Sequence, residues 1–143
     1  MRTLRKFGEF LKSGVVSKRS PDIIRARALL KEAEKRKKFL DSIEKNPGII
    51  DDNANYFIEN SYDTIIEMVR AKLLSKGFYA SGESAHEAEV AFMAELGYAE
   101  TDVRFMNELR YFRNGILYYG KDFDAQYAKR VIEFLKRMYP KLK

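Results

Sequence analysis

Cysteine is absent from this 143-residue chain, and histidine occurs once, as His86. Without cysteine, neither a disulfide framework nor a thiolate metal site can form, and a reducing compartment is the expected location. A single histidine also rules out a metal site built from two histidines of one chain. We therefore expect a protein that carries neither a metal nor another cofactor.

Long apolar runs are missing as well, since no stretch approaches the roughly 20 apolar residues that a membrane-spanning helix needs. The first residues, MRTLRKFGEFLKSG, are basic but lack the uninterrupted apolar segment of a secretory signal. Glycine-rich phosphate loops are absent too, because GESAHE and GKDFD match neither a Walker nor a dinucleotide-binding motif. We expect a soluble, cytoplasmic protein without a membrane partner.

The composition that remains is globular, with 45% hydrophobic and 34% charged residues in a length that fits one domain. The net charge of +6 is concentrated at the two ends of the chain. Residues 1–19 and residues 129–143 each carry six basic groups and one acidic group. Such ends attract phosphate backbones, but solvated helix faces and tails carry similar charges. The sequence alone leaves both interpretations open.

Apolar residues recur at helical spacing in five segments, at about 20–46, 53–76, 84–97, 101–119 and 124–139. An Asn-Pro-Gly sequence at 46–48 ends the first segment, Gly77 ends the second and Pro140 ends the last. Strands have little support. We predict an all-α fold, an up-and-down bundle of four to five helices. Residues 20–143 would form this bundle, and residues 1–19 a basic N-terminal arm or short helix.

Polar residues at the start of the third segment indicate a helix cap. Ser84-Ala85-His86-Glu87 has the S-x-x-E pattern of a capping box. A protonated His86 at this position would oppose the helix dipole, so we expect a neutral, solvent-facing ring. The carboxylates that follow lack an apolar-walled pairing and are predicted to be charges on helix surfaces. These are Glu87, Glu95, Asp102 and Glu108.

The segment ELRYFRNGILYYGKDF, residues 108–123, stands out from the rest of the chain. Arg113 falls beside the apolar stripe of its helix, where a permanent charge needs a carboxylate, a phosphate or a neighbouring subunit. Asn114 and Gly115 follow in mid-helix, although both weaken helices. Polar residues where apolar packing is expected often mark a functional or interface site. A helix-end cap with a snorkelling arginine is the alternative interpretation.

Together with two earlier stretches, this segment resembles the HEPN family of helical-bundle proteins over about residues 20–139. The stretches are RARALLKEAEKRKKFL, SYDTIIEMVRAKLLSKGFYASGESAHEAEVAF and LRYFRNGILYYGKDFDAQYAKRVIEFLKRM. Active HEPN ribonucleases carry Arg-x(4–6)-His, commonly Arg-Asn-x-x-x-His, and pair two such motifs across a homodimer to cleave RNA without metal. Arg113 and Asn114 match the start of the motif, and Tyr118 occupies the histidine position.

A tyrosine at the histidine position changes the expected chemistry. Its ordinary pKa near 10 makes it a poor general base at neutral pH, and losing such a group costs roughly 10² to 10⁴ in rate. The resemblance therefore implies a catalytically degenerate, dimeric binding or regulatory protein. Its interface cleft would hold RNA, a nucleotide or a minimal nucleotidyltransferase partner, as in a toxin–antitoxin-like pair. Arg113, Asn114 and Tyr118 would line this cleft, with Arg110 and Tyr119 as further binding residues.

Two other functions remain open from the sequence. A metal-independent endoribonuclease would use Arg113 with Tyr118 as an unconventional catalytic partner. A purely structural protein would instead engage an acidic partner protein through its basic ends.

Overall fold

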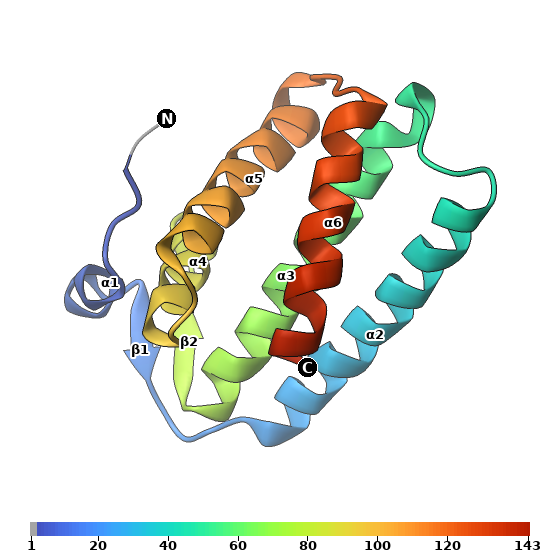
Figure 1. The fold of residues 1–143 in the computed structure, drawn as a ribbon. Coiled ribbons are helices and arrows are strands. Elements are labelled where there is room, and N and C mark those ends of the chain that lie inside the picture. Colours follow the sequence, from blue (N-terminus) through green and yellow to red (C-terminus); the bar gives the residue numbers. More distant parts are fainter. Residues whose placement is uncertain (1–2) are drawn as a thin grey trace.

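The structure of this chain is a computed structural model that describes residues 3–143. It consists mainly of helices, with one small two-stranded sheet (Figure 1). In chain order the elements are α1 (Phe7–Ser13), β1 (Val16–Lys18), α2 (Ile23–Lys45), the 3₁₀ turn η1 (Asp51–Asn53), α3 (Ala54–Ser75), β2 (Phe78–Ala80), α4 (Ala85–Glu95), α5 (Glu100–Tyr119) and α6 (Ala125–Leu142). The predicted all-α class is confirmed, and α2 to α6 correspond to the five expected segments.

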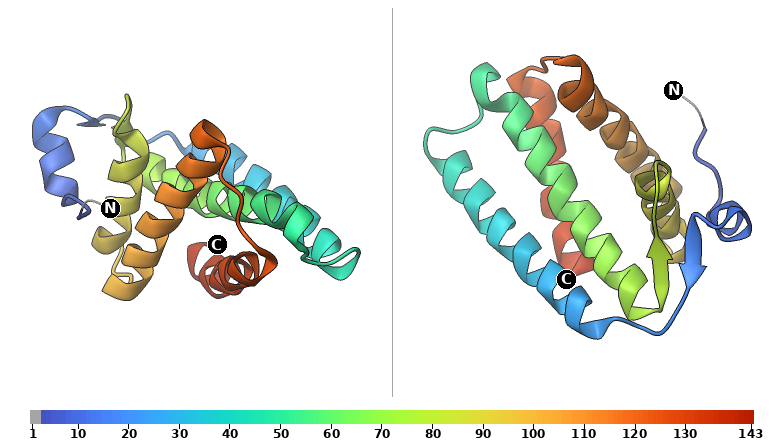
Figure 2. Two further views of the ribbon diagram at one scale, coloured as in Figure 1. Left: turned by 90° about the horizontal axis from the view of Figure 1, so that it is seen from above. Right: turned by 180° about the vertical axis from the view of Figure 1, so that it is seen from behind.

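α3 is the central helix of the fold. Thirteen of its 22 residues are buried, because α2, α4, α5 and α6 all pack against it. Figure 1 shows α2 antiparallel to α3, α5 antiparallel to α6, and α4 behind α5; the rear view in Figure 2 shows α4 in front of α5. Buried side chains such as Phe57, Ile65 and Leu135 form the core, each contributing roughly 1.5–3 kcal/mol. Side chains on α3 consequently meet residues from helices far along the chain.

Local signals place most helix ends close to their predicted positions. α2 begins just after Asp22, whose side chain caps the helix in place of the Ser20-Pro21 start expected from the sequence. The sequence predicts that the last helix stops at Pro140, but α6 continues to Leu142. Leu142 is buried there, and the backbone N–H of Lys143 donates to the preceding turn. Packing of the apolar side chain therefore keeps this turn closed.

The N-terminal segment is joined to the rest of the fold by α1 and β1. Phe7 and Phe10 of α1 are buried. The ring of Phe7 lies 5.4 Å from that of Phe78 and 4.9 Å from that of Phe92, measured between centroids. β1 pairs with β2 in antiparallel register. Local sequence patterns do not predict this sheet, because each strand is three residues long and its partner lies far along the chain.

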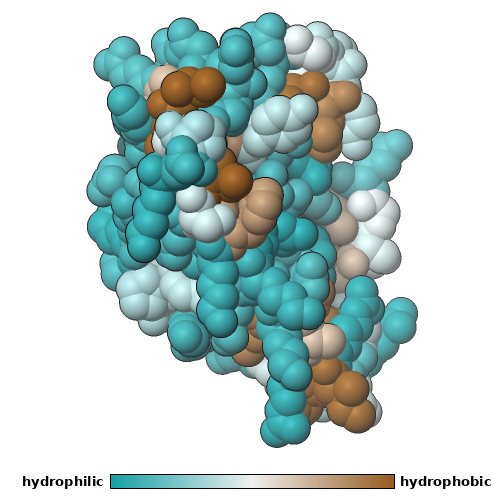
Figure 3. All heavy atoms as spheres, turned by 90° about the vertical axis from the view of Figure 1, so that its right-hand side faces the viewer, coloured by the Kyte–Doolittle hydropathy of each residue, from teal (hydrophilic) through white to brown (hydrophobic). Residues whose placement is uncertain are grey.

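The surface on the α2 side is mainly hydrophilic, and its hydrophobic residues lie in separate patches (Figure 3). Ile23, Ile24 and Phe39 are the exposed large apolar residues of α2. Scattered apolar side chains of this kind are normal on a protein surface. Within residues 3–143, no helix is both long enough and apolar enough to cross a membrane.

Candidate functional site

A buried tyrosine and five further polar side chains from three helices lie together, and we call these six residues the Tyr62 cluster. They are Tyr62, Asp63 and Arg70 on α3, His86 and Glu89 on α4, and Arg113 on α5. Asp63 and Arg70 are seven residues apart, and His86 and Glu89 three apart, so each pair lies on one face of its helix. Figure 2 shows α3, α4 and α5 from behind, where the three helices adjoin.

Tyr62 links the histidine of α4 to the arginine of α5. Its side chain is fully buried, and its hydroxyl oxygen lies 3.2 Å from Nδ1 of His86. Burial raises the pKa of this hydroxyl far above its ordinary value, so the hydroxyl keeps its proton. The guanidinium carbon of Arg113 lies 5.5 Å from the centre of the same ring, a cation–π distance. One tyrosine thus holds both side chains in place.

Arg113 lies in a partly dry position. Its side chain is 18% exposed, and its Nη2 donates to Oδ1 of Asp63 at 3.2 Å. Its Nε is buried and has no hydrogen-bond partner among the described residues. A guanidinium has five N–H donors in a planar fork that fits carboxylate or phosphate oxygens. The single bond to Asp63 therefore orients the side chain while leaving donors for another acceptor.

The most deeply buried charge of the cluster is Glu89, which is 2% exposed. Its two carboxylate oxygens accept hydrogen bonds from Nε and Nη2 of Arg70, at 2.5 and 2.9 Å. Bidentate pairing of this kind is the strongest form of side-chain ion pair. Because Arg70 neutralises Glu89 and Asp63 pairs with Arg113, the cluster brings charges together without a large net charge.

The prediction that His86 faces solvent is wrong. The ring is half-buried, stacks beside Tyr62 at a centroid distance of 6.1 Å and bonds to its hydroxyl. Burial lowers the pKa of His86 below 6.5; Arg70 and Arg113 lower it further, while Glu89 and Asp63 oppose the shift. A neutral ring that accepts a hydrogen bond from the tyrosine hydroxyl at Nδ1 carries its own proton at Nε2. This contact depends on how α4 packs against α3, which the sequence of α4 alone does not show.

The lowered pKa of His86 predicts a loss of stability as the pH falls through about 6.5. The unfolded chain then binds a proton that the folded ring takes up only at lower pH, so unfolding becomes easier. His86→Gln should flatten this part of the stability profile, measured by urea unfolding between pH 7.5 and 5.5. As the chain has one histidine, its ring NMR signal gives the pKa directly. A ring that titrates at or above 6.5 would contradict the expectation.

The capping box predicted at the start of α4 does not form. The side chain of Ser84 caps no backbone N–H group. Instead, Arg5 donates to the Ser84 hydroxyl at 3.3 Å and to Glu87 Oε1 at 2.8 Å. These charge-assisted bonds hold the Glu87 carboxylate against Arg5 instead of the backbone at the start of α4, and they lower the pKa of Glu87. Glu87 and likewise Asp102, which pairs with Arg137, are buried, so the prediction of surface charges is wrong for both.

The other residues singled out in the sequence surround a hollow at the C-terminal end of α5. This α5-end hollow has a volume of about 840 Å³ and is lined by Arg110, Asn114, Tyr118 and Tyr119 together with the loop at 121–123. Asn55 of α3 anchors the loop, because its side chain donates to the carbonyl of Lys121 at 2.8 Å. A Cβ at Gly115 would lie 3.4 Å from the stem of Lys121, an ordinary contact distance, so space alone does not require a glycine in mid-helix.

Arg113 and Tyr118 do not meet. Five residues along an α-helix correspond to a rotation of about 140°, so the two side chains lie on different faces of α5. Tyr118 is 73% exposed and lines the α5-end hollow, whereas Arg113 turns toward α3. Arg110 donates from Nε and Nη2 to Oδ1 of Asn107, at 3.1 and 3.0 Å. The predicted site residues are thus divided between the Tyr62 cluster and the α5-end hollow.

Tyr62, Asp63, His86 and Glu89 were not identified from the sequence, but one signal pointed to two of them. α4 has the sequence AHEAEVAFMAE, which is apolar except for its histidine and its glutamates. Polar residues in a short, mostly buried helix require partners inside the fold. Within residues 3–143, no group of three or more His, Asp or Glu residues could hold a metal ion. The chain matches no known family model, no curated protein and no solved structure.

Proposed function

We propose that this chain is a HEPN-like binding protein that holds RNA or a nucleotide through a phosphate at the Tyr62 cluster. The observation that carries the proposal is the state of Arg113, which is partly exposed, set on the Tyr62 ring and oriented by one bond to Asp63. Because this guanidinium is already held in one orientation, it loses little conformational freedom when it binds phosphate. The neutral ring of His86 adds a hydrogen-bonding group from α4.

The proposed protein is a homodimer in which a second copy covers the outward face of α5. Four large apolar side chains on this helix are exposed, Tyr111 and Leu117 at 47% each, Tyr118 at 73% and Tyr119 at 79%. They flank Arg110 and Asn114, so a second copy would bring further polar groups to the α5-end hollow. The family resemblance adds a minimal nucleotidyltransferase as a candidate partner. A monomeric mass by light scattering at micromolar concentration would contradict the dimer.

RNA binding tests the role of Arg113. Arg113→Ala should weaken binding of a labelled single-stranded RNA oligonucleotide about 10- to 100-fold in fluorescence anisotropy, as expected for the loss of charge-assisted hydrogen bonds. Arg104→Ala is the matched control. Arg104 lies on the same helix and carries the same charge, but it is 69% exposed, and within residues 3–143 it pairs with Glu100 alone. Equal losses in both variants would indicate unspecific attraction and overturn the proposal.

A second candidate function, a metal-independent endoribonuclease, is favoured by the contact between His86 and Tyr62. When the imidazole is neutral with its proton at Nδ1, donated to the Tyr62 oxygen, its Nε2 can accept the proton of a 2′-hydroxyl. The 2′-oxygen then attacks phosphorus, the bond to the 5′-oxygen breaks and a 2′,3′-cyclic phosphate forms. The 5′-oxygen leaves as a hydroxyl with a proton taken from water, while Arg113 stabilises the charge on phosphorus. His86 thus replaces Tyr118 as the proposed partner of Arg113, since Tyr118 lies on another face of α5.

The same RNA separates the two candidates. An endoribonuclease should cleave it in the presence of a chelator, and both His86→Ala and Arg113→Ala should abolish cleavage while Tyr118→Phe leaves it unchanged. Binding without cleavage by the unmodified protein supports the binding function alone. Cleavage that survives both substitutions would come from a contaminant.

A further inference from the structure

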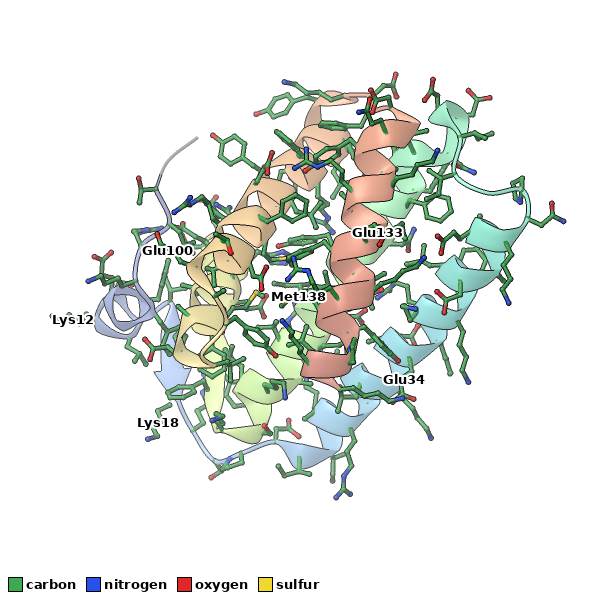
Figure 4. The ribbon with its side chains drawn as sticks, in the orientation of Figure 1. Lys12, Lys18, Glu34, Glu100, Glu133 and Met138 are labelled. Carbon is green, nitrogen blue, oxygen red and sulfur yellow. The ribbon has the colours of Figure 1, made fainter. Side chains whose placement is uncertain are left out.

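A second surface, formed by α5 and α6 and separate from the Tyr62 cluster, has the residues and charge of a docking groove. α5 and α6 both pack against α3, and a groove of about 930 Å³ lies between them. Figure 4 looks onto this pair of helices, with Glu100 labelled at the start of α5 and Glu133 on α6. Arg113, Asn114 and Tyr118, the residues at the HEPN motif positions, do not line this groove, nor does the proposed RNA site.

The floor of the groove is aromatic. Phe105 of α5 and Phe134 of α6 line it, and their ring centroids are 4.6 Å apart. Tyr127 adjoins Phe105 at 6.5 Å. Phe134 is almost fully buried, and Phe105 is partly exposed. Apolar side chains of a ligand would therefore find a narrow strip of ring surface between the helices.

The rim of the groove on α6 is basic. Lys129, Arg130, Lys136 and Arg137 all line it and are all exposed. Lys129 and Arg130 form one pair, and Lys136 and Arg137 form a second pair seven residues later, which is two helical turns or about 10.5 Å along the helix. One acid, Glu133, interrupts the row and is itself 74% exposed. A row with this spacing matches a second helix that carries acidic residues seven positions apart.

The two basic pairs differ in how far the fold already neutralises them. Lys136 pairs with Glu44 and Arg137 with Asp102, at 2.8 and 2.7 Å. By contrast, Lys129 and Arg130 have no carboxylate within 4 Å among the described residues. Arg130 lies over the rings of Phe105 and Tyr127, at 5.6 Å from each. The end of the groove at Lys129 and Arg130 therefore carries the charge that a ligand could neutralise.

We infer that the groove between α5 and α6 docks an amphipathic helix of a partner protein. Apolar residues of that helix pack on the exposed part of Phe105 and on the aliphatic stems of Arg130 and Arg137, and its acidic residues pair with Lys129 and Arg130. Helix-in-groove docking combines an apolar floor with complementary charges in this way. Nucleic acid fits the groove less well, because base stacking needs open aromatic faces. Here guanidinium groups already cover the rings, Arg130 that of Phe105 and Arg137 that of Phe134.

A designed peptide tests this inference. The probe is a fluorescent 18-residue helical peptide with leucines at positions i, i+3 and i+7 and glutamates paired seven residues apart. A scrambled peptide of the same composition and a single-stranded RNA serve as comparison ligands. The designed peptide should bind at micromolar concentration and more weakly as salt is raised. The scrambled peptide should bind at least tenfold more weakly, because its apolar residues no longer share one face.

Charge reversal locates the binding. Lys129→Glu with Arg130→Glu should weaken peptide binding at least tenfold. Lys12→Glu with Lys18→Glu, which changes the net charge equally on α1 and β1, should change it less than twofold. Arg113→Ala should leave peptide binding unchanged, which separates this inference from the proposed RNA site. Absence of binding at 100 µM, equal binding of the scrambled peptide, or tighter binding of RNA with the same sensitivity to reversal at 129 and 130 would each overturn the inference.

Discussion

Gly77→Ala is expected to destabilise the protein by about 3 kcal/mol, measured by urea unfolding. Gly77 follows the last turn of α3 with a φ of +85°, a conformation that costs an alanine roughly 1–2 kcal/mol. An added Cβ would also run into the backbone carbonyl oxygen of Arg19. That neighbour cannot move freely, because the N–H of Arg19 donates to the carbonyl of Gly77 at 2.6 Å. Overpacking of this kind adds roughly 1–3 kcal/mol.

Gly97→Ala is the matched control for this substitution. Gly97 follows α4 with a φ of +87°, and a Cβ there would have no heavy atom within 4 Å. Its substitution should therefore cost about 1–2 kcal/mol, the conformational part alone. The difference between the two variants measures how tightly the chain before α2 is held against the end of α3. Equal losses in Gly77→Ala and Gly97→Ala would mean that the close approach of the Arg19 backbone to Gly77 adds nothing to the loss of stability.

Gly77 also illustrates which parts of the fold could be predicted. Its role as the residue after a helix follows from its neighbours in the sequence, as does the end of α2 at Asn46. Helix periodicity is likewise a local property, so the five segments were placed well. The pairing of β1 with β2 and the burial of Phe10 depend instead on contacts between distant segments. No local pattern reports such contacts.

The candidate site follows the same division. Arg113 was identified from its place beside an apolar stripe, which is a local signal. Its partner Asp63 lies 50 residues earlier in the chain, and the contact depends on how α3 and α5 pack. The family motif is linear and pairs Tyr118 with Arg113, whereas helix geometry turns the two side chains apart. The contact of His86 with Tyr62 depends on how α4 packs on α3, so the sequence of α4 alone does not predict it.

Glu89→Ala is expected to destabilise the protein by about 3 kcal/mol. The carboxylate is almost fully buried, and its removal leaves the Arg70 guanidinium without its partner in a place that is 26% exposed. Breaking a buried ion pair from one side costs roughly 3–5 kcal/mol, and partial exposure of Arg70 places the loss at the lower end. Urea unfolding of Glu89→Ala, compared with the exposed pair variant Glu100→Ala, measures it. Glu100→Ala should cost less than 1 kcal/mol.

Replacing both charges tests whether the pair serves stability alone. Arg70→Met with Glu89→Met removes both charges together, so most of the stability lost in Glu89→Ala should return.

The pKa of His86 should respond to each of the two charges separately. Glu89 raises the pKa of His86 and Arg70 lowers it, so Glu89→Gln should lower that pKa and Arg70→Met should raise it, both read from the ring NMR signal. If the stable double variant also keeps full RNA binding, the pair only holds α3 to α4. A loss of RNA binding without a loss of stability would mean that the pair sets the electrostatic environment in which His86 and Arg113 act.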